Sequence, residues 1–449
     1  MKILITNQII IQNPNRKIID FIKENLILDN PDYIQAEKLG RYSRGIPKKL
    51  ELFTRNADTF YLPFGTLQDI WRLKDNDTSY KLDFSPFKPL EMLGSINLYD
   101  YQEQALNTLK KGKNGILEAP CGSGKTQIGL ALIKAIGGKA LWLTHTHDLL
   151  EQSKKRCETY FKGDFGTITQ GKVNIGKDIT FATVQTMCKI EPSLYENEFT
   201  TIIVDEAHRC IGTPTKVTMF YKILNNCKAR YKFGLSATLN RSDGLINCLF
   251  SLIGNKLYSI PRECVEDKII KCDYKVIIND KKYDPFEYTF NATIDFNMLL
   301  NMLCEDNTRN ELIIDNVMKN LDRDQLILSH RVKHVEILAK LLQERGIECS
   351  VVTGKIKNRN FTSKIIIATY SLAKEGLDIP KLDVLHLTTP QKDKTTTVQS
   401  VGRIERNIEG KKQPICFDYL DTDISYCLMC QNKRKNMIIK RWHKLWKLN

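Results

Sequence analysis

The sequence contains no long apolar segment of the kind that crosses a membrane. No stretch of the 449 residues reaches about 18 consecutive apolar side chains, so we expect no membrane span. The N-terminus, MKILITNQIIIQNPNRK, has neither a sustained apolar core nor a small-residue cleavage site, and it is unlike a signal peptide. These absences predict a cytoplasmic protein that is not secreted.

Paired cysteine motifs are also lacking. The 13 cysteines are odd in number and scattered, which is typical of reduced thiols in the cytosol rather than of a disulfide framework. Cys427 and Cys430 are the only close pair, and a zinc site needs about four ligands. We therefore interpret these two residues as core or surface thiols.

Acidic residues are comparatively scarce. The chain has 67 Lys and Arg residues against 52 Asp and Glu, a formal net charge of +15. This excess indicates a polyanionic partner, either nucleic acid or an anionic membrane surface, with a solvated basic surface as an equal alternative. A hydrophobic content of 42% is enough to build cores, which excludes a mostly disordered chain, and the length predicts about two to four domains.

Hydrophobic patterning divides the chain into a leading module and two α/β units. Residues 1–95 mix apolar clusters with turn residues, and we expect a small α+β module there. In residues 96–262 and again in 305–430, short apolar runs alternate with helical stretches, which indicates βαβ units on parallel sheets. Residues 263–304 look irregular and are predicted to link the two units, and residues 431–449 form a basic tail. The expected strands are 115–118, 140–144, 179–182, 201–204, 325–329, 349–353, 364–369 and 384–387.

A phosphate-binding loop follows the first of these strands. The segment APCGSGKT, residues 119–126, lies between Glu118 and the helical stretch QIGLALIKAI. In such a loop, backbone N–H groups and the helix N-terminus surround the phosphates, and Gly122 and Gly124 allow close approach. We expect Lys125 to place its charge on the β- and γ-phosphates of ATP, and the hydroxyl of the following threonine to hold Mg²⁺.

An acidic pair closes a later strand. Strand 201–204 runs into the tetrapeptide DEAH, residues 205–208, and carboxylates at a buried strand end need a compensating charge. We expect Mg²⁺ to supply it, held by Asp205 through a water shell. Glu206 would then orient and deprotonate the attacking water.

A pair of arginines in the second half complements these motifs. QSVGRIER, residues 399–406, places Arg403 and Arg406 three residues apart, so on a helix they share one face. Two guanidinium groups so placed can meet a γ-phosphate across a cleft between the units, as arginine fingers do.

Taken in order, these segments resemble the motifs of the superfamily 2 helicases over most of residues 97–420. Tyr101-Gln102 is similar to the adenine-reading element ahead of the phosphate loop, THDLLEQ at 146–152 to motif Ia, and ATVQ at 182–185 to a later strand-contacting motif. The combination of DEAH, SATLNRSDG and QSVGRIER is similar to the XPB/UvsW-like branch, which has phage and large-virus members.

The resemblance implies two tandem RecA-like lobes after the N-terminal module. ATP and Mg²⁺ would bind between the lobes, and a nucleic-acid strand would be held mostly through its phosphates and moved 3′ to 5′. Motifs and resemblance together give the candidate site residues. They are Lys125, Glu206, Gln399, Arg403 and Arg406 for catalysis; Gln102, Pro120, Cys121, Gly122, Ser123, Gly124, Lys125, Thr126, Gly376 and Asp378 for ATP; Thr126 and Asp205 for Mg²⁺; His208, Ser236 and Thr238 for coupling; and Thr146, Thr183, Gln185 and Thr369 for nucleic acid.

These motifs predict a nucleic-acid-dependent ATPase that acts as a helicase or translocase, with DNA favoured over RNA and a monomeric state. An RNA-directed or transcript-release helicase is the alternative within the enzyme class. An ATP-gated clamp or annealing factor that does not unwind is the alternative from another class. A membrane surface is no longer expected as the partner of the basic charge.

The basic tail 431–449 leaves two interpretations open. It has seven Lys and Arg residues and no acidic residue, and Trp442 and Trp446 lie at helical spacing. We favour docking of the tryptophans on a lobe and expect the cations to give auxiliary DNA contacts. The leading residues 1–95 either contact duplex or branched DNA or only brace the first lobe.

Overall fold

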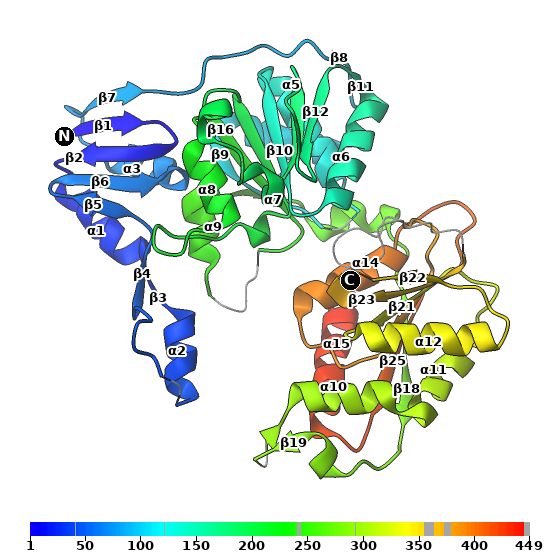
Figure 1. Ribbon diagram of the computed structural model, residues 1–449. Helices are drawn as coiled ribbons and strands as arrows, with labels where there is room; N and C mark the ends of the chain where they lie inside the picture. Colours follow the sequence, from blue (N-terminus) through cyan, green and yellow to red (C-terminus); the bar gives the residue numbers. More distant parts are fainter. Residues whose placement is uncertain are drawn as a thin grey trace. The chain divides into compact units, whose positions relative to one another are not determined.

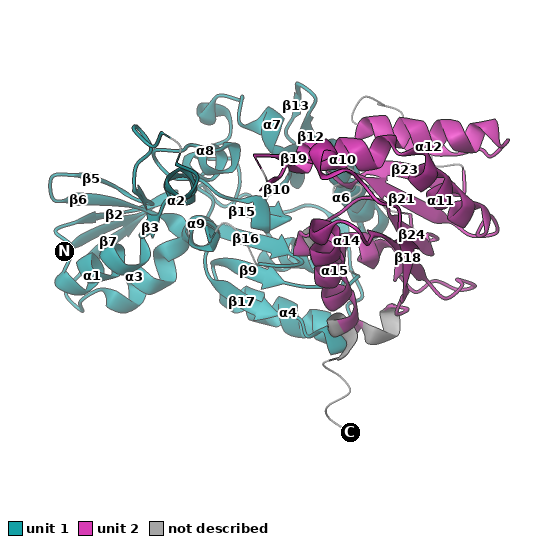
Figure 2. Ribbon diagram, turned by 90° about the horizontal axis from the view of Figure 1, so that it is seen from below, with its two compact units in different colours: residues 1–264 teal, residues 265–449 magenta. Residues whose placement is uncertain are grey.

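The chain forms two compact units, Met1–Cys264 and Val265–Asn449 (Figure 2). The computed structural model describes residues 1–40, 42–120, 122–239, 244–291, 293–353, 363–371 and 379–443, with only the backbone described at 266–268, 395 and 440–443. Within these ranges, no helix combines the length and the apolar character needed to cross a membrane.

The first unit is built on an eight-stranded sheet with strand order β13-β12-β14-β10-β15-β16-β9-β17 (Figure 1). Its neighbouring strands are parallel except for the edge pair β12 and β13. The central strands are continuous apolar runs because helices cover both faces of the sheet. The strands are β9 (Asn114–Glu118), β10 (Ala140–Thr144), β12 (Phe165–Thr169), β13 (Lys172–Asn174), β14 (Ile179–Thr183), β15 (Thr201–Asp205), β16 (Tyr231–Ser236) and β17 (Lys256–Ser259).

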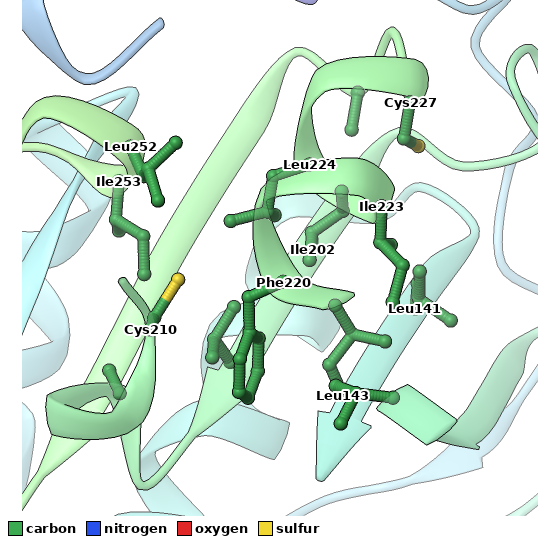
Figure 3. Packing of buried hydrophobic residues seen from close by; sticks show 14 of the residues in the cluster. Leu141, Leu143, Ile202, Cys210, Phe220, Ile223, Leu224, Cys227, Leu252 and Ile253 are labelled. Atoms are coloured by element: carbon green, nitrogen blue, oxygen red, sulfur yellow. The ribbon is translucent and has the colours of Figure 1, made fainter. Parts of the chain in front are cut away.

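Two layers of helices enclose this sheet. On one face, Phe220 and Ile223 of α8 pack beside Leu143 of β10 in a fully apolar cluster (Figure 3). On the other face, Gly129 of α5 lies against Trp142, which alternates with Leu143 along the strand. The helices are α4 (Asp100–Lys111), α5 (Lys125–Ile136), α6 (His147–Tyr160), α7 (Val184–Met187), α8 (Met219–Asn226) and α9 (Ile246–Ile253).

An N-terminal sheet of order β5-β6-β2-β1-β7 belongs to the same unit. Its buried residues form one cluster with Cys248 of α9, and a Cβ atom on Gly65 would lie 2.2 Å from the Phe250 carbonyl oxygen. The N-terminal sheet therefore packs directly on the first lobe. Its elements are β1 (Lys2–Ile5), β2 (Gln8–Gln12), α1 (Arg16–Asn25), β5 (Thr54–Asn56), β6 (Thr59–Pro63), α3 (Leu67–Leu73) and β7 (Ser79–Leu82); a separate hairpin has β3 (Ile27–Asp29), α2 (Pro31–Lys38) and β4 (Lys49–Glu51).

A buried lysine lies where the N-terminal sheet meets the first lobe. Lys232 of β16 is 1% exposed, and its ammonium group donates to the carbonyl oxygens of Leu224 at 2.9 Å and Asn7 at 3.3 Å. The same Nζ atom is 4.5 Å from the centre of the Phe64 ring. Because burial disfavours the charged form, the pKa of Lys232 is lowered to about 8.

The second unit contains a six-stranded parallel sheet of order β18-β25-β24-β21-β23-β22. Alternate residues of each strand face opposite sides: Leu326 and Leu328 contact the cluster under α14 and α15, and Ile327 contacts α11 and α12. The elements are β18 (Asp273–Asn279), α10 (Phe296–Glu305), α11 (Asn307–Met318), β21 (Gln325–Ser329), α12 (Val332–Glu344), β22 (Ser350–Val352), β23 (Ile365–Thr369), β24 (Val384–Leu387), α14 (Lys394–Ile404), β25 (Ile415–Asp421) and α15 (Ser425–His443).

The prediction that residues 263–304 form an irregular linker is wrong. Strand β18 pairs with β25 along its whole length, from Asp273 opposite Ile415 to Asn279 opposite Asp421, and α10 follows it. The partner strand lies more than a hundred residues further along the chain, so no local pattern marks β18 as part of the sheet.

The prediction of a separate basic tail from residue 431 is also wrong, because helix α15 continues to His443. Arg434 is 1% exposed and binds the Asp418 carboxylate through Nε at 2.8 Å and Nη2 at 2.6 Å. One of the seven basic residues of the tail is therefore ion-paired in the core of the second unit. Ile438 is buried in the same region, whereas Trp446 lies outside the described residues.

The cysteine pair in α15 is buried in the second unit. Cys427 and Cys430 are both free thiols, and burial raises the pKa of each. Both residues are therefore core thiols, kept protonated at neutral pH.

Candidate functional site

The carboxyl edge of the eight-stranded sheet brings together residues that are far apart in the sequence. Ser236 of β16 pairs with Glu118 of β9, and β15 ends beside them at Asp205. Thr144 and Thr183 pair at the ends of β10 and β14. The predicted motifs of the first unit thus lie along one edge, which is where parallel sheets bind ligands.

The loop after β9 has the backbone shape that a phosphate cradle requires. Gly122 and Gly124 adopt φ values of 85° and 77°, which side chains with a Cβ atom rarely tolerate. A Cβ atom on Gly124 would also lie 2.3 Å from Nε2 of Gln102. Within the described part of the chain, no atom beyond the neighbouring residues lies within 4 Å of the Cβ position on Gly122, so that side of the loop is open. Cys121 lies outside the described residues.

Hydrogen bonds from helix α4 hold this loop in position. The Gln102 side-chain amide donates to the Ser123 carbonyl oxygen at 2.9 Å and accepts from the Tyr99 N–H at 3.0 Å. The Ser123 hydroxyl donates to the Pro120 carbonyl oxygen at 2.7 Å and closes the turn. Gln102 therefore positions the loop, and adenine recognition by this residue remains a prediction.

The acidic pair after β15 lies next to the loop lysine. Glu206 adopts a positive φ of 50°, an uncommon conformation that is typical of functional sites. Lys125 Nζ is 3.5 Å from Glu206 Oε1, and both side chains are mostly buried. The Glu206 backbone N–H donates to Asp205 Oδ1 at 2.9 Å, which orients the first carboxylate.

The electrostatics of this pair fit a divalent cation. Burial, and then the negative charge of Glu206, raise the pKa of Asp205 above its usual range, while Lys125 opposes the shift. A buried carboxylate whose pKa is raised in this way ionises fully when a cation binds it, because the cation stabilises the charged form. Thr126 offers a hydroxyl in the first turn of α5. An oxygen donor set of this kind suits Mg²⁺.

A polar chain runs from the acidic pair to the end of β16. His208 Nδ1 is 3.3 Å from Glu206 Oε2 and 3.1 Å from Ser236 Oγ. The Ser236 hydroxyl in turn donates to the Thr238 carbonyl oxygen at 2.7 Å. The three predicted coupling residues therefore lie in one connected series, starting at the carboxylate of Glu206.

The predicted nucleic-acid contacts of the first unit lie further along the same edge. Thr146 caps α6, and its hydroxyl accepts from the Leu149 N–H at 3.4 Å. Gln185 donates to the His145 carbonyl oxygen at 2.7 Å. Thr183 is largely buried at the end of β14. These contacts bring two motifs together that are about forty residues apart.

The second unit carries its predicted residues on β23 and α14. Thr369 ends β23, and Gln399 is buried in α14 at 6% exposure with no partner for Oε1 among the described residues. Arg403 lies in the last turn of α14, but this helix ends at Ile404, and Arg406 instead forms an isolated bridge with Ile269. The expectation that the two arginines share a helix face is therefore wrong. Gly376 and Asp378 lie outside the described residues.

Sequence reasoning missed the role of Glu118 at the start of the loop. Its Oε1 accepts from the Leu239 N–H at 3.3 Å, just after the Ser-Ala-Thr turn. Its Oε2 accepts from Lys256 Nζ at 3.1 Å and from Ser259 Oγ at 3.2 Å on β17. One carboxylate thus ties three separate segments together. An acidic residue ahead of a phosphate loop was the only available signal.

Comparisons with known proteins match both units. Residues 95–241 match the family model "Type III restriction enzyme, res subunit", and residues 308–407 match "Helicase conserved C-terminal domain". A protein of Escherichia phage T5 described as a probable helicase, D10, is 27% identical over 317 residues, which cover 68% of this chain and 67% of that protein. The "DNA 3′-5′ translocase XPB2" of Sulfurisphaera tokodaii is 33% identical over 187 residues, 41% of this chain and 40% of that protein.

Solved structures agree with the fold. The Saccharomyces cerevisiae protein Dbp5, in a complex with RNA and ADP BeF3, superposes with a TM-score of 0.56 at 14% identity, over 76% of this chain and 88% of Dbp5. The prediction of two RecA-like lobes is confirmed by this likeness and by the parallel sheets of the two units. From the motifs, their clustering and these matches, we conclude that the chain belongs to the superfamily 2 helicases, in the XPB/UvsW-like branch, and is an ATP-dependent helicase.

Proposed function

We propose that this helicase is a DNA-directed motor that moves along one strand in the 3′ to 5′ direction as a monomer. The observation that carries the proposal is the connected series from Lys125 through Glu206 and His208 to Ser236. It links a lysine of the phosphate loop to a turn at the sheet edge. The choice of DNA rests on the likeness to the Sulfurisphaera translocase, whose name states that substrate and polarity.

In this proposal the first unit binds ATP and activates water. Lys125 binds the terminal phosphates through its ammonium group, within the cradle formed by the loop. Glu206 accepts the proton of the attacking water, and the second oxygen of that carboxylate lies 3.3 Å from His208 Nδ1. Thr126 and Asp205 would hold Mg²⁺, which neutralises phosphate charge when bound.

The second unit supplies positive charge to the same reaction. We assign Arg403 and Arg406 to the transferred phosphate and Gln399 to the water or the phosphate oxygens. The buried, unsatisfied oxygen of Gln399 supports a role for its side chain in binding a ligand group. Gly376 and Asp378 complete the proposed nucleotide contacts.

Nucleic acid binds, in this proposal, along the carboxyl edges of the sheets. Thr146, Thr183 and Gln185 in the first unit and Thr369 in the second are assigned to backbone phosphates. Because phosphates carry no sequence information, the grip is expected to be sequence-independent and salt-sensitive.

The test compares Glu206→Gln with Glu191→Gln, an exposed glutamate of the same unit. DNA-stimulated kcat should fall at least about 100-fold for Glu206→Gln and remain unchanged in the control, because Glu206 lies beside the loop lysine and is the proposed base. Normal turnover by Glu206→Gln would refute the assignment of the base.

The substrate is tested separately with matched DNA and RNA strands. If RNA stimulated ATP turnover more strongly than DNA, RNA would replace DNA as the proposed substrate. Strand displacement on forked and four-way DNA, measured with the same preparation, distinguishes a motor from an ATP-gated clamp: a clamp hydrolyses ATP and binds these substrates without releasing a strand.

A further inference from the structure

A basic hairpin extends from the N-terminal sheet and has no role in the site described above. We define the basic arm as residues 27–51, which comprise β3, α2, the connecting loop and β4. Strands β3 and β4 form their own two-stranded antiparallel sheet, separate from the five-stranded one. Figure 1 shows α2 at the far end of this ribbon.

The loop side of the arm is strongly cationic. The segment from Lys38 to Lys49 contains five Lys and Arg residues and no acidic residue, whereas the four acidic residues of the arm, Asp29, Asp32, Glu37 and Glu51, lie on either side of this segment. Lys38, Arg44 and Lys48 are exposed, and neither Lys38 nor Arg44 has a carboxylate partner among the described residues. Tyr42, in the middle of the segment, is 76% exposed. Lys49 Nζ pairs with Asp29 at 2.6 Å, and Lys48 Nζ lies 5.4 Å from the centre of the Tyr33 ring. Exposed cations beside an exposed aromatic side chain are the composition of a nucleic-acid contact.

The base of the arm is held in a fixed conformation. Asn30 is 4% exposed, and its side chain donates to the Pro47 carbonyl oxygen at 2.7 Å and accepts from the Asp32 N–H at 3.1 Å. Its backbone N–H donates to the Lys48 carbonyl oxygen at 3.0 Å. These bonds join the residue that precedes α2 to the Pro47–Lys48 end of the cationic segment, so this end has a defined position at the base of the arm.

The arm is also tied to the ATPase lobe. Lys216 Nζ lies 2.8 Å from Asp32 Oδ2, and Lys216 follows the DEAH segment by a few residues. A partner bound to the arm is consequently held by the same unit that carries the phosphate loop.

We propose that the basic arm binds the phosphate backbone of duplex DNA, which rests on the proposed DNA-directed function. Single-strand sites rely on several aromatic platforms, whereas the arm presents three cations and one exposed aromatic ring. Its composition therefore fits backbone phosphates. The single strand already has an assigned path along the sheet edges, so the arm is assigned to the paired region of the substrate.

The experiment compares two triple variants of the full chain. One removes arm charges through Lys38→Ala, Arg44→Ala and Lys48→Ala. The control removes the same charge from the neighbouring helix α1 through Arg16→Ala, Lys17→Ala and Lys23→Ala, all of them exposed. Affinity for a labelled duplex is measured by anisotropy from about 50 to about 200 mM salt.

Each phosphate contact contributes about 0.9 to the slope of log affinity against log salt on duplex DNA. Three lost contacts would lower the slope by about 2.7, which changes the affinity ratio of wild type to arm variant about 40-fold over this range. The control variant should retain the wild-type slope. Equal slopes for the arm and control variants would overturn the proposal.

Three further readouts keep the outcomes separate. The assignment to duplex would be overturned by two results together. The arm variant would lower the salt slope only on single-stranded DNA, by about 0.7 per contact, and Tyr42→Ala would lower the affinity for single-stranded DNA. Melting temperatures of both variants verify folding. If wild-type ATP turnover is not stimulated by DNA, the proposed function fails; if it is stimulated and the arm variant behaves like the control, only the arm assignment fails.

Discussion

Replacement of Lys232 by methionine tests the junction between the N-terminal sheet and the first lobe. The pKa of this buried lysine is about 8, against an ordinary value of 10.5. At about 1.4 kcal/mol per pKa unit, ionising Lys232 in the folded protein costs about 3 kcal/mol. Methionine has a similar shape and no charge, so Lys232→Met removes this cost.

The cost depends on pH in a defined direction. Above pH 10.5 the amine is neutral in both the folded and the unfolded chain. As the pH falls from 10.5 to 8, the unfolded chain binds a proton and the folded chain does not, so stability is lost through this window and stays lost below it. The pKa of the nearby Cys227 thiol is raised from 9.0 to about 11, so this group also changes stability as the pH rises above 9, but it is present in wild type and in Lys232→Met and its contribution is removed when the two are compared.

Urea unfolding, followed by tryptophan fluorescence, measures this effect. Trp71 and Trp142 both lie in the first unit. Between about pH 7.5 and pH 10, the free energy of unfolding of wild type should rise by about 2 kcal/mol relative to Lys232→Met. The hydrogen bonds lost with the lysine contribute a constant offset, because the neutral amine still donates.

The control is Lys222→Met, which changes an exposed lysine of α8. Its stability difference from wild type should stay constant with pH. If the difference between wild type and Lys232→Met also varied by less than about 0.5 kcal/mol over this range, the burial of an ionisable amine at this junction would be refuted.

Three further substitutions test other contacts. Glu118→Gln weakens the hold on Lys256 and the Leu239 N–H, so kcat for ATP should fall about tenfold with KM nearly unchanged; an equal change in KM would contradict a positioning role. Ser236→Ala breaks the polar series at its end, and ATP turnover should persist while strand displacement per ATP falls; proportional losses would argue against coupling. Arg434→Met leaves the Asp418 carboxylate buried and unpaired, so urea unfolding should show the second unit less stable by about 3–5 kcal/mol, and a loss below about 1 kcal/mol would contradict this account.

Local sequence patterns predicted several central strands and the helix after the phosphate loop well. Strands β10, β21 and β24 have the predicted bounds, and α5 follows the phosphate loop as expected. These elements are coded by continuous apolar runs and by glycines at fixed positions, and each signal lies within a few residues. The position of Glu206 directly after a strand has the same local origin, and its role as the base stays a prediction.

Features that depend on distant partners were not predictable. Nothing near Glu118 indicates that it binds Leu239 and Ser259, more than a hundred residues away. In the sequence, Lys232 has the surroundings of an ordinary strand lysine, and only the packing of the N-terminal sheet removes its side chain from water. Arg406 leaves the helix face because its backbone pairs with Ile269, which the spacing of the two arginines could not reveal.

The order of strands in the second unit has a consequence for synthesis on the ribosome. Strand β18 emerges first, but among the described strands its only neighbour in the sheet is β25, which also separates it from β24. The first unit can fold while the rest is translated, whereas β18 waits as an unpaired strand until residues 415–421 leave the exit tunnel. A ribosome stalled between these points would hold a folded first lobe joined to an unpaired strand. The exposed backbone N–H and C=O groups of such a strand make it a target for a chaperone.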